Sequence, residues 1–180
     1  MIPFVQSKFE RRPDDNYQTI DERCVVALGE SWDIPGPVWE PCAPDGSGIA
    51  AAWPDRVICG SDAMTDPVPD DARSIITNTP YKTKVCNAMV TRLSGFVADG
   101  SLDVAAFLYR SQWDHAGGIR AKMLDEPPFA GLVRLRFRPW WSEDRDSSPI
   151  HSYQWVIFDR RHIGEPVVRY WPRSKAWRAA

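Results

Sequence analysis

Short apolar runs alternate along this chain with stretches of helical periodicity, and this alternation restricts the possible fold more than any other feature. Cys24, Val25 and Leu28 recur at helical spacing, whereas Ser74-Ile75-Ile76-Thr77 is typical of a short buried strand. Alternating strands and helices favour a parallel sheet with helices on both faces, because a parallel connection needs a long crossover. The predicted strands are 38–40, 56–60, 74–77, 102–108, 132–137, 153–158 and 167–171, and the predicted helices are 24–32, 49–53, 85–93 and 119–124.

The end of the chain has a different pattern, because its last three predicted strands follow one another without a helix between them. This order favours an antiparallel pair that closes one edge of an otherwise parallel sheet. Apolar and arginine side chains alternate over residues 133–138, as in a half-exposed strand. The predicted fold class is therefore α/β, a Rossmann-like, mostly parallel seven-stranded sheet with an antiparallel edge pair and helices on both faces.

The chain has 180 residues, of which 43% are hydrophobic and 26% charged, and these values suit one globular domain. Residues 1–16 are expected to form a polar arm, and residues 17–180 are expected to form the domain. No apolar run of about 18 residues or signal-like segment occurs, so we expect a cytoplasmic protein without a membrane partner. The four cysteines form no C-x-x-C pair, which argues against a metal site and indicates a reducing compartment.

The net charge of −2 conceals an uneven distribution of charge along the chain. Residues 131–180 carry ten Lys and Arg against five Asp and Glu, whereas residues 1–130 carry twelve against nineteen. A basic segment of this kind suits contact with a polyanion, although a solvated basic sheet edge gives the same counts.

Candidate ligand-binding residues follow three of the predicted strands. In open α/β sheets ligands bind at the carboxyl ends of the strands. Glu40 ends the first strand and leads into Pro41-Cys42-Ala43-Pro44-Asp45-Gly46-Ser47-Gly48, a loop whose glycines allow close approach to a ligand. Asp62 follows the second strand and could bind the hydroxyls of a ribose. A simple strand–helix turn would explain the loop equally well, and a helix N-cap or turn aspartate would explain Asp62.

The segment Asn78-Thr79-Pro80-Tyr81, which follows the third strand, is more specific. The amide oxygen of Asn78 can accept a hydrogen bond from an exocyclic amine, and a Thr79 or Pro80 carbonyl can accept another. Tyr81 can stack on a flat base. Such acceptors orient the nitrogen lone pair towards an electrophilic methyl group without a covalent enzyme intermediate.

Together these segments resemble those of the S-adenosylmethionine-dependent N6-adenine DNA methyltransferases, which carry an acidic-Pro-x-x-Gly-x-Gly loop and an (Asn/Asp/Ser)-Pro-Pro-(Tyr/Phe) motif. More narrowly, the chain resembles the small phage- and prophage-type members of that class. The segments that carry this narrower resemblance are Tyr17-Gln18-Thr19, Pro35-Gly36-Pro37-Val38-Trp39-Glu40-Pro41 and Tyr153-Gln154-Trp155-Val156-Ile157-Phe158-Asp159-Arg160.

The resemblance covers about residues 17–172 and implies a class I methyltransferase fold that methylates a flipped-out adenine. It implies that Asn78, Pro80 and Tyr81 are catalytic. It implies that S-adenosylmethionine, the one cofactor expected, contacts Tyr17, Thr19, Glu40, Pro41, Asp45, Gly46, Asp62 and Asn78. No separate target-recognition domain is expected, because the catalytic fold uses nearly the whole chain.

Two positions depart from the family pattern. Pro44 replaces the first loop glycine, and a proline lacks the backbone N–H and fixes φ near −65°. Thr79 replaces a proline of the catalytic motif. These departures leave open a weak or inactive relative that only binds nucleic acid. RNA, protein or a small amine is also an open substrate class, because the motif serves any planar amine; a Rossmann dehydrogenase fits less well, because no G-x-G-x-x-G is present.

DNA is the expected partner. Its contacts are expected on loops near residues 110–118 and 139–152 and on the alternating arginines Arg134, Arg136 and Arg138, which we call the arginine stripe. Arginine can contact phosphates or base edges, and tryptophan can stack on an unstacked base. An ordinary surface connection with a partly buried tryptophan would explain each loop equally well. The candidate nucleic-acid-binding residues are Arg110, Trp113, Arg134, Arg136, Arg138, Trp140 and Trp141. The sequence does not indicate an oligomeric state or a recognition sequence.

Overall fold

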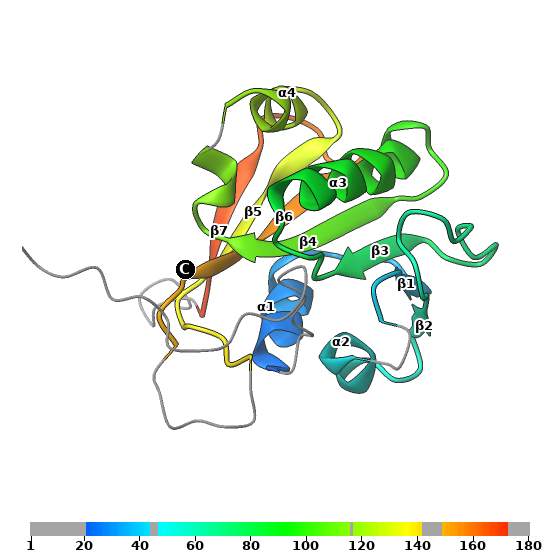
Figure 1. The fold of residues 1–180 in the computed structure, drawn as a ribbon, viewed down its shortest axis with the longest axis horizontal. Helices are drawn as coiled ribbons and strands as arrows, with labels where there is room; N and C mark the ends of the chain where they lie inside the picture. Colours follow the sequence, from blue (N-terminus) through cyan, green and yellow to red (C-terminus); the bar gives the residue numbers. More distant parts are fainter. Residues whose placement is uncertain (1–20, 44–46, 116, 142–148, 173–180) are drawn as a thin grey trace, which may run out of the picture.

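The computed structural model describes residues 21–43, 47–115, 117–141 and 149–172, and these residues build one seven-stranded sheet flanked by helices (Figure 1). The strands are β1 (Val38–Glu40), β2 (Val57–Cys59), β3 (Ser74–Thr77), β4 (Val104–Arg110), β5 (Phe129–Leu135), β6 (Tyr153–Asp159) and β7 (Val167–Trp171). The helices are α1 (Arg23–Ser31), α2 (Gly48–Ala52), α3 (Thr83–Ala98) and α4 (Ile119–Asp125), with the short 3-10 helix η2 (Trp113–His115) before α4.

The strand order is β2-β1-β3-β4-β6-β5-β7. All neighbouring strands are parallel except β6, which runs antiparallel to both β4 and β5. The prediction of a Rossmann-like α/β fold with a mostly parallel seven-stranded sheet is therefore confirmed. The antiparallel strand lies inside the sheet, and the edge strand on that side is β7, which pairs with β5 in parallel.

Two hydrophobic cores cover the two faces of the sheet, because side chains of each strand alternate between the faces. On β4, Val104, Ala106 and Leu108 pack towards α1 and α2. The intervening Phe107 and Tyr109 pack towards α3 and α4. Figure 1 shows α1 and α2 on one side of the sheet and α3 and α4 on the other.

The boundaries of several elements differ from those predicted. Helix α1 begins after Glu22, which supplies no side-chain cap, and Asp21 accepts a hydrogen bond from the Arg23 amide. Strand β4 continues two residues further than predicted and includes Arg110. The predicted half-exposed strand over 132–137 is wrong in its exposure: β5 ends at Leu135 and is mostly buried, because helices cover both of its faces and β6 and β7 flank it.

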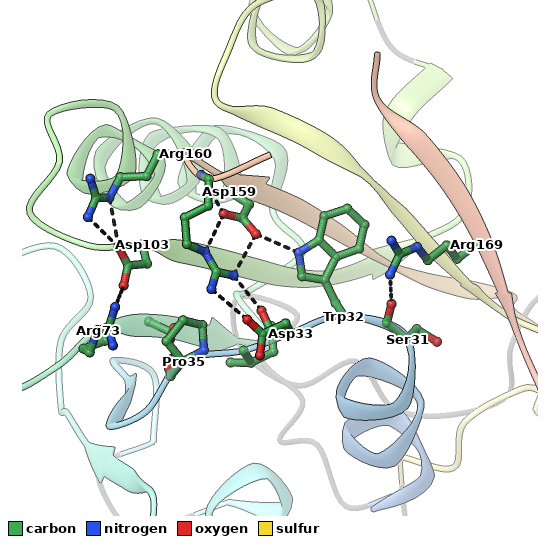
Figure 2. Close-up of polar contacts among 12 residues, drawn as sticks. Ser31, Trp32, Asp33, Pro35, Arg73, Asp103, Asp159, Arg160 and Arg169 are labelled. Atoms are coloured by element: carbon green, nitrogen blue, oxygen red, sulfur yellow. Dashed lines mark hydrogen bonds and ion pairs between the residues drawn. The ribbon is translucent and has the colours of Figure 1, made fainter. Parts of the chain in front are cut away.

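A network of ion pairs closes the sheet at the edge where the parallel strands begin (Figure 2). The buried carboxylate of Asp103 lies between the guanidinium groups of Arg73 and Arg160. The buried carboxylate of Asp159 accepts hydrogen bonds from the Trp32 indole at 2.9 Å and from Arg161. The Asp-Arg pair at the end of β6 is thus part of the structural network at this end.

In the part of the chain that the structure describes, no helix is long and apolar enough to cross a membrane. The same residues contain no group of three or more His, Cys, Asp and Glu side chains that could hold a metal ion. All four cysteines are free thiols.

Candidate functional site

The candidate site lies at the edge of the sheet where β1, β3 and β4 end. These strands are parallel, so their carboxyl ends lie along the same side of the sheet. Glu40, Asn78 and Arg110 stand at these ends. The end of β2 lies beside Glu40, where the Gly60 amide donates to the Glu40 carbonyl at 2.8 Å. The topology therefore brings together the three strand ends that sequence analysis selected.

Glu40 is a buried acid, with 3% of the residue exposed. The Ser47 hydroxyl donates a hydrogen bond to its carboxylate, and no described basic side chain forms an ion pair with it. Burial raises the pKa of Glu40 to about 7, although the Ser47 hydrogen bond acts in the opposite direction. A buried carboxylate without a protein counter-ion is suited to bind a cationic group of a ligand.

Ser47 connects this carboxylate to helix α2. Its hydroxyl oxygen accepts hydrogen bonds from the amides of Ile49 and Ala50 while its proton is directed to Glu40. Serine is a favoured N-cap residue for this reason. The side chain therefore fixes the start of α2 relative to the end of β1.

Gly60 leaves no room for a side chain at the end of β2. A Cβ atom there would lie 2.6 Å from the Trp39 indole nitrogen and 3.0 Å from the Pro41 Cα. The glycine therefore lets the loop after β2 approach the segment after β1, where Pro41 is itself buried.

Asp62 is exposed and belongs to a compact turn. Its carboxylate accepts a hydrogen bond from the Met64 amide at 2.8 Å, as expected for a turn aspartate. The Asp66 carboxylate in turn accepts from the amides of Ser61 and Asp62, and Arg92 of α3 donates to the Asp66 carbonyl. The turn alternative is therefore observed, and it holds Asp62 in a defined place beside the end of β2.

Asn78 and Tyr81 contact each other within the loop after β3. The Tyr81 hydroxyl donates to Oδ1 of Asn78 at 2.8 Å, and Asn78 is 5% exposed. Pro80 lies between them and is half-buried. The amide oxygen assigned to an amine thus faces a phenol of its own motif.

The Tyr81 ring lies in a group of aromatic side chains that we call the aromatic cluster: Tyr81, Tyr109, Trp141 and Tyr153. Its centroid lies 6.1 to 6.4 Å from those of the other three rings. The Arg110 guanidinium lies over the Tyr81 ring, 5.5 Å from its centroid. Burial raises the pKa of Tyr81 well above its ordinary value, so the phenol remains a hydrogen-bond donor.

Thr79, the departure within the catalytic motif, has a partner that proline could not provide. Its hydroxyl is hydrogen-bonded to the phenol of Tyr109, and both residues are almost fully buried. The substitution therefore satisfies a buried polar atom on β4.

Trp113 is a buried residue, which agrees with the alternative of an ordinary loop that carries a buried tryptophan. It is 6% exposed and stacks on Tyr109 with centroids 4.8 Å apart, and its indole donates to the Cys86 thiol. The guanidinium of Arg120 lies over the same ring. A ring with these contacts is not presented to a nucleic acid.

The arginine stripe is divided by its contacts. Arg134 forms an ion pair with Asp114 at 3.3 Å, and Arg136 stacks over the Tyr170 ring. Arg138 is exposed and donates to the Pro149 carbonyl at 3.3 Å. The three arginines therefore do not form one continuous surface for phosphates.

The two tryptophans that follow are both half-buried. The Trp140 amide donates to Asp21, and Trp141 packs edge-on against Tyr81. Trp141 is thus the tryptophan of this segment that reaches the catalytic motif.

Five sites of interest fall outside the described residues, and the structure does not test them: Tyr17, Thr19, Pro44, Asp45 and Gly46.

Sequence analysis missed Tyr109, Tyr153 and Ser47. Tyr109 lies one residue beyond the predicted strand 102–108, and Tyr153 was used only as the start of a strand that carries the family resemblance; each lies near a strand end beside the Asn78 loop, and that position was the available signal. Ser47 precedes a predicted helix, so its capping role could have been found. Its contact with Glu40 depends on the loop conformation.

Comparison with solved structures shows a distant likeness of the fold. The methyltransferase subunit of a type I restriction-modification system from Streptococcus thermophilus has 13% sequence identity and a TM-score of 0.45, over 77% of this chain and 42% of that chain. The chain thus spans less than half the length of that protein. No known protein family matches the sequence, and no curated protein is similar to it.

Proposed function

We propose that this protein transfers a methyl group from S-adenosylmethionine to the N6 amine of adenine in DNA, with the base flipped out of the helix. The observation that carries the proposal is the placement of Asn78: a buried amide oxygen at the end of β3, next to an aromatic ring of the same motif. The resemblance of Asn78-Thr79-Pro80-Tyr81 to the methyltransferase motif supports the same chemistry.

The residues at the neighbouring strand ends fit the cofactor. S-adenosylmethionine supplies an electrophilic methyl group when it is bound. Glu40 would hold the ammonium of its methionine part, since this carboxylate is buried without an ion-pair partner among the described residues. Asp62 would hold the ribose hydroxyls, and the turn that ends at Asp66 would keep it in place.

The chain's own residues would act on the amine by position and hydrogen bonding. Oδ1 of Asn78 would accept a hydrogen bond from one amine N–H, and a backbone carbonyl of the loop would accept one from the other N–H. The nitrogen lone pair would then point away from both acceptors. Tyr81 would stack on the base. Positioning of this kind is enough to accelerate methyl transfer, because the donor methyl group is already activated.

Incubation of the full chain with tritiated S-adenosylmethionine and separate DNA, RNA, protein and small-amine acceptors tests the proposal. Label in the N6 position of DNA adenine is the expected result, and Asn78→Ala should remove it while cofactor affinity stays unchanged. Label in another acceptor would replace adenine as the substrate. Wild-type label that persists in Asn78→Ala would remove the assigned role of the amide.

A second candidate function is supported by the contact between Asn78 and Tyr81. Because the phenol already occupies the amide oxygen, the protein could be a nucleic-acid-binding relative that no longer methylates. Titration calorimetry with S-adenosylmethionine separates the two: cofactor binding supports the enzyme, and no binding together with no gain in melting temperature supports the non-catalytic protein.

A further inference from the structure

Arg110 lies against the aromatic cluster, and two further basic residues, Arg138 and His151, lie on segments that adjoin it. Arg110 ends β4, Arg138 follows β5, and His151 precedes β6. Arg138 contacts the segment of His151 directly, because its guanidinium donates to the Pro149 carbonyl at 3.3 Å. The strand pairing of Arg110 with Tyr153, and the bond of Ser111 N–H to the Ser152 carbonyl at 2.9 Å, bring β4 to the same segment.

Within the described residues these side chains have no acidic partner, in contrast to the arginines at the other end of the sheet. Arg73, Arg160 and Arg161 form ion pairs with carboxylates at that end (Figure 2). None of the described acids forms an ion pair with Arg110, Arg138 or His151.

Two further observations concern the surroundings of these basic groups. Asp114, on the η2 segment, is bound by Arg134 and by the Gln154 side chain. The Nε of Arg110 is buried and has no hydrogen-bond partner in the described chain. An anion that accepted this N–H would satisfy a buried donor that is otherwise costly.

We propose that Arg110, Arg138 and His151 form a phosphate-binding subsite for the nucleic-acid strand whose base would stack on Tyr81. The inference rests on the proposed function for the identity of the strand. The geometry favours a nucleic acid over a small amine, because the basic groups adjoin the ring on which the base would stack. Arg110 connects the two, since its guanidinium lies over the Tyr81 ring.

His151 makes the subsite sensitive to pH. Partial burial and the charges of Arg110 and Arg138 lower the pKa of His151 below its ordinary value. The imidazole is therefore neutral at neutral pH when no ligand is bound. A phosphate between these groups favours the protonated ring, so strand binding and proton uptake are coupled.

The test measures binding and not methyl transfer, so it uses the full chain and a short thymidine-only DNA strand that carries no adenine. The affinity is measured by fluorescence anisotropy across a salt series at about pH 7.5 and about pH 5.5. For wild type the slope of log affinity against log salt should become steeper at the lower pH by about 0.7, the value for one single-strand phosphate contact. His151→Gln should abolish that difference, and Arg138→Gln should reduce the slope by about 0.7 at both pH values.

Two matched variants control for charge and for histidine number. Lys122→Gln removes an exposed cation of α4 and should leave the slope unchanged. His162→Gln removes the histidine beside Trp32, at the opposite end of the sheet, and should keep the pH difference. Melting temperatures measured by circular dichroism confirm that each variant folds.

A pH difference that persists in His151→Gln, or an unchanged slope in Arg138→Gln, would overturn the subsite. Failure of the proposed function would give a different combination of binding and methylation results. Wild type that binds the strand with these dependences but methylates nothing would retain the subsite without the enzyme. Wild type that methylates a small amine and binds no strand would overturn the subsite and leave a methyltransferase.

Discussion

The Tyr81 hydroxyl donates a hydrogen bond to Oδ1 of Asn78 at 2.8 Å, so the aromatic and amide groups of the candidate catalytic motif bind each other. The same ring packs against Tyr109, Trp141 and Tyr153. An amine that uses Oδ1 must therefore share or displace the phenol. In the observed loop, the Tyr81 hydroxyl thus takes up one acceptor position of the Asn78 amide oxygen.

Tyr81→Phe is expected to strengthen binding of the DNA substrate, because it keeps the ring and removes the hydroxyl that competes for Oδ1 of Asn78. A hydrogen bond of about 1 kcal/mol corresponds to an approximately fivefold lower KM for the DNA acceptor, with S-adenosylmethionine affinity unchanged. Steady-state kinetics with tritiated cofactor measure both values. Tyr170→Phe, which changes an exposed tyrosine of β7, is the control, and an unchanged KM in Tyr81→Phe would show that the phenol does not compete.

Thr79 and Tyr109 should be coupled in stability. Thr79→Val removes the hydroxyl that pairs with the buried Tyr109 phenol, and an unpaired buried phenol should lower the free energy of unfolding by about 1–3 kcal/mol. In a double-mutant cycle, Tyr109→Phe should cost less in the Thr79→Val background than in the wild type. In that background the Thr79 hydroxyl is already absent, so removal of the phenol leaves no buried hydroxyl without its partner. Urea unfolding measures the cycle, and strictly additive losses would contradict the coupling. The exposed substitution Thr91→Val should change little.

Asp62 should contribute to cofactor affinity through its charge. We expect Asp62→Ala to weaken S-adenosylmethionine binding at least about tenfold, the value of one hydrogen bond to a charged group. Asp62→Asn keeps an oxygen for the Met64 amide, so it separates the turn from the ligand contact and should still lose affinity. Calorimetry measures both, with Asp70→Ala as a control at an exposed acid of the same loop. Wild-type affinity in Asp62→Ala would assign this residue to the turn alone.

Glu40 should make stability fall as the pH rises. Its pKa is raised from 4.5 to about 7 in the folded protein, so the folded state binds a proton that the unfolded state releases between these values. The contribution of Glu40 to the free energy of unfolding is fully present below about pH 4.5. It is lost as the pH rises through about 7, by an amount on the order of 3 kcal/mol. Asp103 and Asp159 act in a lower window, because their pKa values are lowered below the ordinary 3.8.

Glu40→Gln should remove this dependence. Urea midpoints of wild type and variant, compared at pH values below 4.5 and above 7, give the difference, and the comparison cancels the opposite effect of His151. The wild-type affinity for S-adenosylmethionine should rise over the same interval, because only the ionised carboxylate attracts an ammonium, and the variant should show no such rise. Parallel pH profiles of wild type and variant would contradict the buried, unpaired state of Glu40.

The sequence predicted the strand ends well because they depend on local patterns. The run Ser74–Thr77 is apolar and short, and the following Asn78 can only lie at its carboxyl end. The position of Arg110 was harder to place, because β4 continues two residues beyond its apolar part through pairing with β6. That pairing also brings Tyr153 beside the loop, and no local pattern encodes it.

The burial of Trp113 has a similar cause. An aromatic residue among polar neighbours, Gln112 and Asp114, fits a base contact and a partly buried loop tryptophan equally well. The turn of η2 instead directs the ring onto Tyr109, and Cys86 of α3 accepts its N–H. Burial of a single side chain in a loop is decided by the elements that pack over it, so the sequence around Trp113 could not reveal it.

Asp159 and Asp33 bind the same arginine and should differ greatly in their effect on stability. Asp159 is 5% exposed and also accepts the Trp32 indole N–H, whereas the Asp33 side chain is 86% exposed. Burial opposes ionisation of Asp159, but hydrogen bonds from Arg161 and Trp32 outweigh it and lower its pKa. Asp159→Ala leaves the Trp32 indole N–H unpaired and leaves Arg161 with only the exposed Asp33, so it should cost about 3 kcal/mol, whereas Asp33→Ala should cost less than about 1 kcal/mol. Urea unfolding at neutral pH gives both values, and the wild-type advantage over Asp159→Ala should shrink as the pH falls below 3.8. Equal losses in the two variants would mean that burial does not decide the strength of this network.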